Sequence, residues 1–260
     1  GQNVIVTTTE KLQIEERLTA KLIIDSLFAT HLRETGKNIW GEKTPTHYYH
    51  IDDILSLYPK SAIICLIRDP RAVFASMKRY ARKKKDSADY FWWMTENPEK
   101  AAMLWLDAYD RTMKWKDKIS FVKYEELVQS PEAILRDLAE RYLNIPYSPK
   151  MLKYYEKAED KITNMPDWHK PTTQKVNPAN AERWRSELTS AEIGQIESIL
   201  HKQMREFGYE LESDGLRNTG NFKITVKRSI YVGRGMINRS LKYTAWRTIR
   251  FLKQIFAIIR

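Results

Sequence analysis

The sequence predicts an α/β protein in which a parallel β-sheet is flanked by helices. Short apolar runs at 62–67 and 119–124 have the length of buried strands, and helical periodicity fills much of the sequence around them. Parallel strands need long crossover connections, which are usually helices, so this alternation favours a parallel sheet. One cysteine, Cys65, stands in 260 residues, so the fold has no intrachain disulfide framework and depends on its hydrophobic core.

The first 60 residues are predicted to be mainly helical. Residues 4–6 give a weak strand signal. A stripe of leucines runs through 10–35, and Gly36 stands in the usual stop position of that helix. Residues 38–43 are expected to be extended, and 47–58 to form a second helix that ends before a proline.

The two strands are expected to be fully buried. All six side chains of 62–67 are apolar, which is typical of a strand covered on both faces. Pro70 then suits the first turn of a helix that runs to about residue 84. A further helix is predicted over 99–118, directly before the second strand at 119–124.

The later helices begin at capping signals. Ser130 is expected to be the N-cap of a helix over 131–143, with a proline at its first position. Thr189 and Glu192 have the spacing of a capping box, and Gly208 is expected to end the helix that they open.

The positive charge is confined to the end of the chain. The net charge is +11 and the pI is near 9.5, yet residues 1–214 hold 33 basic and 33 acidic residues. All eleven excess charges follow Asp214. We therefore expect an α/β domain over 1–214 and a basic tail over 215–260.

Residues 237–260 combine a basic face with a wide apolar face at helical spacing. This pattern is typical of a helix that lies in a membrane interface, so an anionic membrane surface is one expected partner. The corresponding location is cytoplasmic, peripheral to the inner face of a membrane. The alternative is that the apolar face docks on the domain or on another chain. No nucleic-acid motif accompanies the basic residues, so nucleic acid is not expected as a partner.

Arg68 and Ser76 form a candidate anion site. Arg68 follows the apolar run 62–67 directly, and ligands of open α/β sheets lie at the carboxyl ends of the strands. A guanidinium there can bind a phosphate through paired hydrogen bonds. The Ser76 hydroxyl follows on the next predicted helix. On spacing alone, an exposed arginine and a solvated serine are the alternative.

Lys43 and His47 are candidate catalytic residues. Lys43 ends the predicted extended segment and can place a point charge beside a transferring group. Histidine exchanges protons near neutral pH, so His47 suits a general base. A surface lysine and a packed histidine are the alternatives. His47 and His50 lie three residues apart, but zinc sites normally need a third ligand, so no metal is expected.

Five segments give the chain a resemblance to a known family. They are W-G-E-K-T-P at 40–45, I-C-L-I-R-D-P-R-A-V-F-A-S at 64–76, F-V-K-Y-E-E-L-V at 121–128, R-W-R-S-E-L at 183–188 and F-G-Y-E at 207–210. In this order they resemble sulfotransferases that use 3′-phosphoadenosine 5′-phosphosulfate (PAPS), above all the bacterial, carbohydrate and tyrosylprotein branches. The resemblance implies a fold like that of P-loop NTPases and sulfuryl transfer from PAPS to a hydroxyl acceptor, without a metal.

The resemblance also implies roles for individual residues. Arg68 and Ser76 correspond to the pair that binds the 3′-phosphate of PAPS. Lys43 corresponds to the lysine that stabilises charge on the leaving 5′-phosphate. Tyr124 corresponds to a residue near the nucleotide.

Lys175 and Arg183 fall in or beside the stretch that closes over the donor in relatives. The resemblance is incomplete at its start, because none of the nine glycines forms the loop that wraps the 5′-phosphosulfate in the family. We expect an N-terminally incomplete sulfotransferase that binds nucleotide weakly and transfers little sulfate. A divergent member that has lost donor binding is the alternative. His47 is the candidate base, since cytosolic relatives carry a histidine near the lysine.

The acceptor is expected to be a glycan or another hydroxyl compound. Basic residues at 78–85 precede an aromatic cluster at 90–93, a combination that suits an acidic sugar. Aromatic packing between helices is the alternative. Two other functions are a non-catalytic basic protein that binds a membrane or nucleic acid, and a nucleotide kinase-like enzyme. The kinase would need a G-x-x-x-x-G-K-[ST] loop, which is absent from the sequence.

Overall fold

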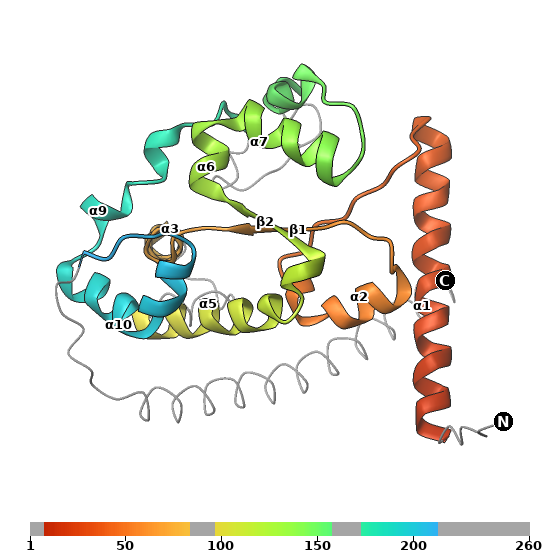
Figure 1. Cartoon of the computed structure of the whole chain (residues 1–260), viewed down its shortest axis with the longest axis horizontal. Helices are drawn as coiled ribbons and strands as arrows, with labels where there is room; N and C mark the ends of the chain where they lie inside the picture. Colours follow the sequence, from red (N-terminus) through yellow and green to blue (C-terminus); the bar gives the residue numbers. More distant parts are fainter. Residues whose placement is uncertain (1–7, 84–96, 158–172, 213–260) are drawn as a thin grey trace, which may run out of the picture. The chain divides into compact units, whose positions relative to one another are not determined.

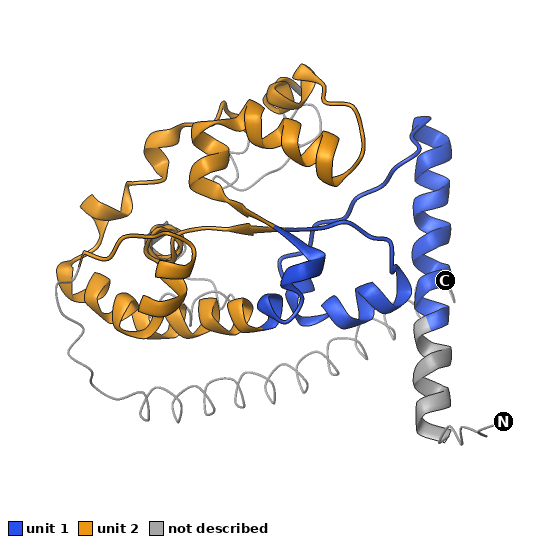
Figure 2. Ribbon diagram, viewed as in Figure 1, with its two compact units in different colours: residues 1–64, 111–120 blue, residues 65–110, 121–260 orange. Residues whose placement is uncertain are grey.

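A computed structural model of the chain describes residues 8–83, 97–157 and 173–212 (Figure 1). The chain divides into two compact units (Figure 2). The first unit consists of Gly1–Ile64 and Arg111–Ser120, and the second of Cys65–Asp110 and Phe121–Arg260. The boundary between them passes through both strands of the sheet.

Several predicted features lie outside the described residues. They are the strand signal at 4–6, the aromatic cluster at 90–93 and the basic tail over 215–260. The division into a domain over 1–214 and a tail, the membrane partner and the cellular location therefore stay predictions. Among the residues that are described, no helix has both the length and the apolar composition that crossing a membrane requires.

The sheet has two parallel strands that are hydrogen-bonded neighbours, β1 (Ile63–Ile67) and β2 (Ile119–Lys123). The chain between them contains the helices α3 (Pro70–Lys83) and α5 (Pro98–Met113). A helical crossover of this kind is what parallel pairing requires. The predicted α/β class and the start of α3 at Pro70 are confirmed.

The prediction that β1 is fully buried is wrong. Ile64 and Leu66 are 41% and 54% exposed, whereas Ile67 is buried. Successive side chains of a strand point to opposite faces of the sheet. One face of β1 is therefore covered poorly by the described residues, and an all-apolar run could not reveal this difference between its two faces.

In the first unit, α1 (Thr8–Thr35) ends at the predicted glycine. Gly36 has a φ of 62°, in the left-handed region that glycine adopts at little cost. The next backbone N–H, of Lys37, donates to the carbonyl of Leu32 at 3.0 Å, which closes the helix as a Schellman turn. The leucine stripe is not a buried stripe, since Leu18, Leu22 and Leu27 are exposed.

The rest of the first unit is irregular up to two short helices, η1 (His47–Tyr49) and α2 (Ile51–Leu57). They replace the single helix predicted over 47–58, and the predicted extended segment at 38–43 forms no strand. Trp40 stacks on Phe28 of α1 with ring centroids 4.0 Å apart. Tyr58, after α2, donates a hydrogen bond to Asp25 at 2.9 Å. These contacts fasten the segment after α1 to the helix itself.

The second unit holds the main hydrophobic core, between α3, α5 and α10 (Ser190–Glu206). From α10 it takes Ile196, Leu200 and Met204, none of which has any exposed surface. Trp184 is also buried there. The predicted helix over 99–118 ends earlier, at Met113, and η2 (Lys116–Lys118) follows it.

The remaining elements of the second unit are short helices. They are α6 (Tyr124–Gln129), α7 (Pro131–Asp137), η3 (Leu138–Tyr142), η4 (Pro149–Lys157), η6 (Pro178–Asn180) and α9 (Trp184–Glu187). Ser130 stands at the N-cap of α7 and a proline opens the helix, as predicted, but the Ser130 side chain forms no capping hydrogen bond. Ser130 also ends α6, where its N–H donates to Glu126 at 2.8 Å, so the end of one helix sets its conformation.

The capping box of α10 is confirmed. The Thr189 hydroxyl accepts a hydrogen bond from the N–H of Glu192 at 3.3 Å, and the Glu192 carboxylate accepts the N–H of Thr189 at 2.8 Å. The helix ends at Gly208, whose φ is 71°. The N–H of Tyr209 donates to Met204 at 2.8 Å, and this Schellman closure fixes the residue after the glycine.

Cys65, in β1, gives the fold a predicted response to alkaline pH. Burial raises the pKa of its thiol from the ordinary 9.0 to about 11. In the unfolded chain the thiol ionises earlier, so the unfolded state binds fewer protons between these values and stability falls as pH rises. We expect the wild type to lose stability relative to Cys65→Ala across this window. Urea unfolding of both proteins at about pH 7.5 and 10.5 measures it, and a constant difference contradicts it.

Candidate active site

Arg68 lies directly after β1, and Tyr124 directly after β2. The Arg68 guanidinium sits over the Tyr124 ring, 4.3 Å from its centroid. Its Nη2 donates to the carbonyl of Asn180 at 3.2 Å. Its Nε is buried, and no described residue forms a hydrogen bond with it. A guanidinium that lies over an aromatic ring and keeps such a donor is suited to bind an anion.

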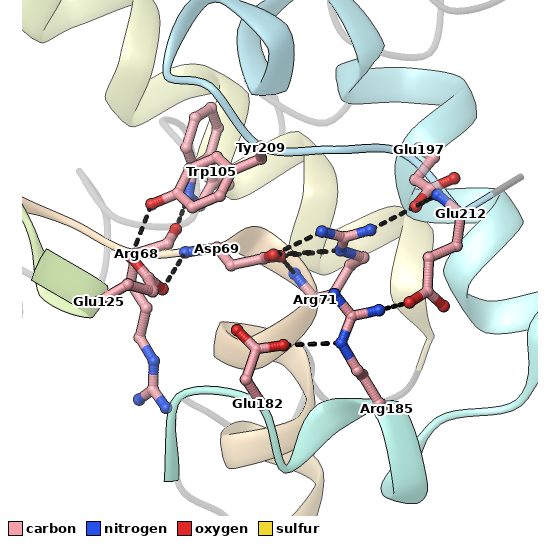
Figure 3. A network of polar contacts seen from close by, with 10 residues as sticks. All are labelled: Arg68, Asp69, Arg71, Trp105, Glu125, Glu182, Arg185, Glu197, Tyr209 and Glu212. Atoms are coloured by element: carbon pink, nitrogen blue, oxygen red, sulfur yellow. Dashed lines mark hydrogen bonds and ion pairs between the residues drawn. The ribbon is translucent and has the colours of Figure 1, made fainter. Parts of the chain in front are cut away.

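The backbone at Arg68 is held by side chains on both sides of one peptide group. The Arg68 carbonyl accepts a hydrogen bond from the indole Nε1 of Trp105, on α5, at 3.1 Å. The N–H of Asp69, in the same peptide group, donates to Glu125 Oε1 at 3.0 Å. The second oxygen of Glu125 accepts the hydroxyl of Tyr209 at 2.9 Å. Figure 3 shows these contacts converging from three parts of the chain.

A buried ion cluster follows at the start of α3. Arg71 pairs with Asp69 at 2.6 Å and with Glu197 of α10 at 2.6 Å, and all three side chains are almost wholly buried (Figure 3). The guanidinium also lies 3.9 Å from the Trp184 ring centroid. Burial opposes its charged form, but the two carboxylates outweigh burial and raise the pKa of Arg71.

Tyr209 joins this network from the turn after α10. Burial comes first among the causes that raise the pKa of its phenol, followed by the nearby Glu125 carboxylate. The hydroxyl therefore stays protonated and remains a hydrogen-bond donor to Glu125 at neutral pH. Lys123 lies over the same ring, with Nζ 4.8 Å from the centroid.

The segment before α9 contributes Asn180 and Arg183. Arg183 donates to the side chain of Asn180 at 3.2 Å, and the backbone carbonyl of Asn180 accepts from Arg68. Three of the predicted donor-site residues, Arg68, Tyr124 and Arg183, are thus linked around Asn180. Lys175 is exposed, and the described residues offer it no hydrogen bond.

Ser76 lies two turns into α3 and is half-buried. In the part of the chain that the structure describes, no hydrogen bond joins its hydroxyl to Arg68. Ser76 and Arg68 belong to the same unit. An anion bound by both side chains would lie between them, so it would need no direct hydrogen bond from one to the other.

Lys43 and His47 belong to the first unit. Lys43 is exposed in the segment before η1. His47 Nε2 lies 3.0 Å from Glu42 Oε2, and the other oxygen of Glu42 accepts the Thr44 hydroxyl at 2.7 Å. A carboxylate that is fixed in this way can orient the imidazole of His47. No group of three metal-ligating side chains comes together within the described ranges.

Sequence reasoning gave no role to several residues of the network. Asp69, Arg71, Glu125 and Tyr209 lie inside the quoted motifs, but the motifs do not say which side chains face each other. Trp105 and Glu197 carried no signal, because they stand on helix faces and meet the strand end only through tertiary packing.

Together these features define an α/β protein with a network of buried polar contacts at the carboxyl end of its parallel strands. The model of the sulfotransferase family matches residues 5–149, more than half of the chain. The chain therefore belongs to the sulfotransferase family.

Three curated relatives agree with this assignment. The chain is 25% identical over 228 residues to nodulation protein NoeE of Sinorhizobium fredii, covering 80% of this chain and 53% of the relative. It is 23% identical to protein-tyrosine sulfotransferase 1 of Danio rerio, covering 77% and 58%. It is 26% identical to carbohydrate sulfotransferase 3 of Tetronarce californica, covering 58% and 36%. The chain thus spans about half the length of the first two relatives, or less for the third.

Two solved structures share the fold. One is a sulfotransferase domain from the curacin biosynthetic pathway, with a TM-score of 0.53, 17% identity, and coverage of 72% of this chain and 69% of that one. The other is a sulfotransferase domain of the Synechococcus PCC 7002 olefin synthase, with a TM-score of 0.54, 20% identity, and coverage of 80% and 72%. At these identities the likeness concerns the fold.

Proposed function

We propose that the protein transfers a sulfuryl group from PAPS to a hydroxyl group, with a glycan as the acceptor class. The observation that carries the donor assignment is the position of the Arg68 guanidinium and its hydrogen bonding. The guanidinium stands at the carboxyl end of β1, lies over the Tyr124 ring and keeps a buried Nε to which no described residue is hydrogen-bonded. An unsatisfied buried donor is costly unless a ligand completes it, and a phosphate oxygen does so.

In this proposal Arg68 and Ser76 bind the 3′-phosphate, with Tyr124 holding the guanidinium from below. Arg183 and Lys175 lie in the segment around η6 and add positive charge on the side of Asn180. These residues supply charge and hydrogen bonds without a metal ion, which suits a polyanionic nucleotide. Kinases that act on nucleotides would use the same kind of anion site, but family membership favours sulfuryl transfer.

The chemical step needs two further roles. The bond from sulfur to the bridging oxygen of the donor breaks as a bond from sulfur to the acceptor oxygen forms. Lys43 offsets the negative charge that develops on the leaving phosphate. His47 takes the proton of the acceptor hydroxyl, while Glu42 orients its imidazole from 3.0 Å. Positioning and charge stabilisation then carry most of the rate enhancement.

The acceptor class is supported by the relatives and by composition. One relative is named as a carbohydrate sulfotransferase and another as a protein-tyrosine sulfotransferase, so both have hydroxyl acceptors in their names. The aromatic cluster at 90–93 after the basic run favours a sugar over a tyrosine side chain.

Calorimetry with 3′,5′-adenosine bisphosphate and with 5′-AMP tests the donor site. We expect the bisphosphate to bind at least about tenfold more tightly, because only it carries the 3′-phosphate for Arg68. Arg68→Ala is expected to abolish this preference. Arg141→Ala is a matched control, since Arg141 is exposed and, among the described residues, pairs with Asp137 on the preceding helical turn. A preference that survives Arg68→Ala contradicts the assignment.

A further inference from the structure

We propose that Glu125 is a positioning residue for the donor site. Its carboxylate holds the peptide group between Arg68 and Asp69, and thereby sets the direction in which the Arg68 side chain leaves β1. The inference rests on the proposed function, because it assigns to Glu125 the aim of Arg68 at the 3′-phosphate.

The peptide group between Arg68 and Asp69 is held at both ends by side chains. Its carbonyl, from Arg68, accepts the Trp105 indole at 3.1 Å, and its N–H, from Asp69, donates to Glu125 at 3.0 Å. A peptide unit is planar, so two hydrogen bonds at its opposite ends fix the orientation of the whole plane. The plane lies between the end of β1 and the start of α3, where no strand or helix partner would otherwise hold it.

The Glu125 carboxylate is itself held in place by a hydrogen bond. Its other oxygen accepts the Tyr209 hydroxyl at 2.9 Å. Tyr209 is buried and follows Gly208, whose φ of 71° and Schellman turn set the place of the ring. The F-G-Y-E turn thus acts on Arg68 through Glu125, although it lies far from Arg68 in sequence.

The helix α6 contacts both the side chain and the backbone of Arg68. Tyr124, its first residue, lies under the guanidinium, and Glu125, its second, holds the backbone. Because the two residues are adjacent in one helical turn, their backbone positions are fixed relative to each other. A shift of α6 would move the side chain and the backbone of Arg68 together.

If Glu125 acted on phosphate binding only through its negative charge, its substitution would have a different effect than if it positions Arg68. Glu125 is an anion close to a site for an anion, so removing its charge should strengthen phosphate binding. Glu125→Gln removes the charge but keeps a carbonyl oxygen for the N–H of Asp69. Glu125→Leu removes the charge and the acceptor. Only the positioning role predicts that leucine weakens binding while glutamine does not.

The measurement is the ratio of affinities for 3′,5′-adenosine bisphosphate and 5′-AMP, by calorimetry on the full chain. We expect Glu125→Leu to lower this ratio at least about fivefold and Glu125→Gln to leave it unchanged or higher. Glu126→Leu is the matched control on the same helix, because Glu126 is exposed and pairs within the described residues with Lys123, at 3.6 Å. A general loss of stability would lower the affinity for both nucleotides by the same factor, so the ratio of the two affinities would stay constant.

Tyr209→Phe is the second variant, for the case that Glu125→Leu does not fold. It keeps the ring and removes the hydroxyl that restrains Glu125, so a smaller loss of the ratio, about twofold or more, is expected. An unchanged ratio in Glu125→Leu, or in Tyr209→Phe where the former does not fold, overturns the inference while the wild-type preference stands. A wild type without any preference for the bisphosphate overturns the proposed function and the inference together.

Discussion

Replacing Arg71 by alanine is expected to lower the free energy of unfolding by about 3–5 kcal/mol. Arg71 is 2% exposed, and its two carboxylate partners, Asp69 and Glu197, are buried as well. The substitution removes the positive charge that pairs with two buried carboxylates, and it removes the group that lies against Trp184. Urea unfolding at neutral pH measures the change.

Two further variants separate the causes. Arg71→Met keeps most of the side-chain volume but removes the positive charge between the two carboxylates, so we expect it to be destabilised nearly as much as alanine. Arg141→Ala removes an arginine that is 83% exposed and pairs with a carboxylate one turn away, so a loss below about 1 kcal/mol is expected. If Arg71→Ala loses no more stability than Arg141→Ala, the cluster does not stabilise the fold.

The elements that could be predicted from the sequence are those with local signals. Gly36 and Gly208 both adopt a positive φ and end their helices as expected. Pro70 begins α3, and Thr189 forms its capping box with the residue three positions later. In each case the cause lies within one helical turn of the residue, so neighbours in the sequence were enough to identify it.

The errors have their cause in tertiary context. Six apolar residues at 62–67 gave no sign that Ile64 and Leu66 would be exposed, because exposure depends on what covers each face of the sheet. Ser130 stands at the N-cap position as predicted, but it also ends α6, and its side chain makes no capping hydrogen bond. A local pattern does not contain the competing demand from the neighbouring helix.

The candidate site divides in the same way. Arg68 could be proposed because a strand end is a local feature, and Tyr124 because it lies within the F-V-K-Y-E-E-L-V segment. The pairing of Arg71 with Glu197 joins residues 126 positions apart, and no spacing rule indicates it. The residues that we propose bind the ligand were therefore easier to predict than the residues that contact them.

Replacing Lys43 by alanine is expected to lower kcat for sulfate transfer by about 100- to 1000-fold, with little change in KM for the donor. The reason is that charge on the leaving phosphate develops in the transition state, so a lysine that offsets it acts mainly there. Lys43 is exposed in the structure, so its removal should not disturb the core. Initial rates with PAPS and the best acceptor from a panel of glycans measure both constants.

Lys37→Ala is the matched control for this prediction. Lys37 is also exposed and lies in the same unit, six residues before Lys43, but outside the W-G-E-K-T-P segment. It is expected to retain wild-type rates, because a surface charge away from the transferring group changes the transition state little. Equal rates in Lys43→Ala and Lys37→Ala would remove Lys43 from the chemical step. A rise in KM at unchanged kcat would instead assign Lys43 to ground-state binding of the donor, and the charge on the leaving phosphate would need another partner.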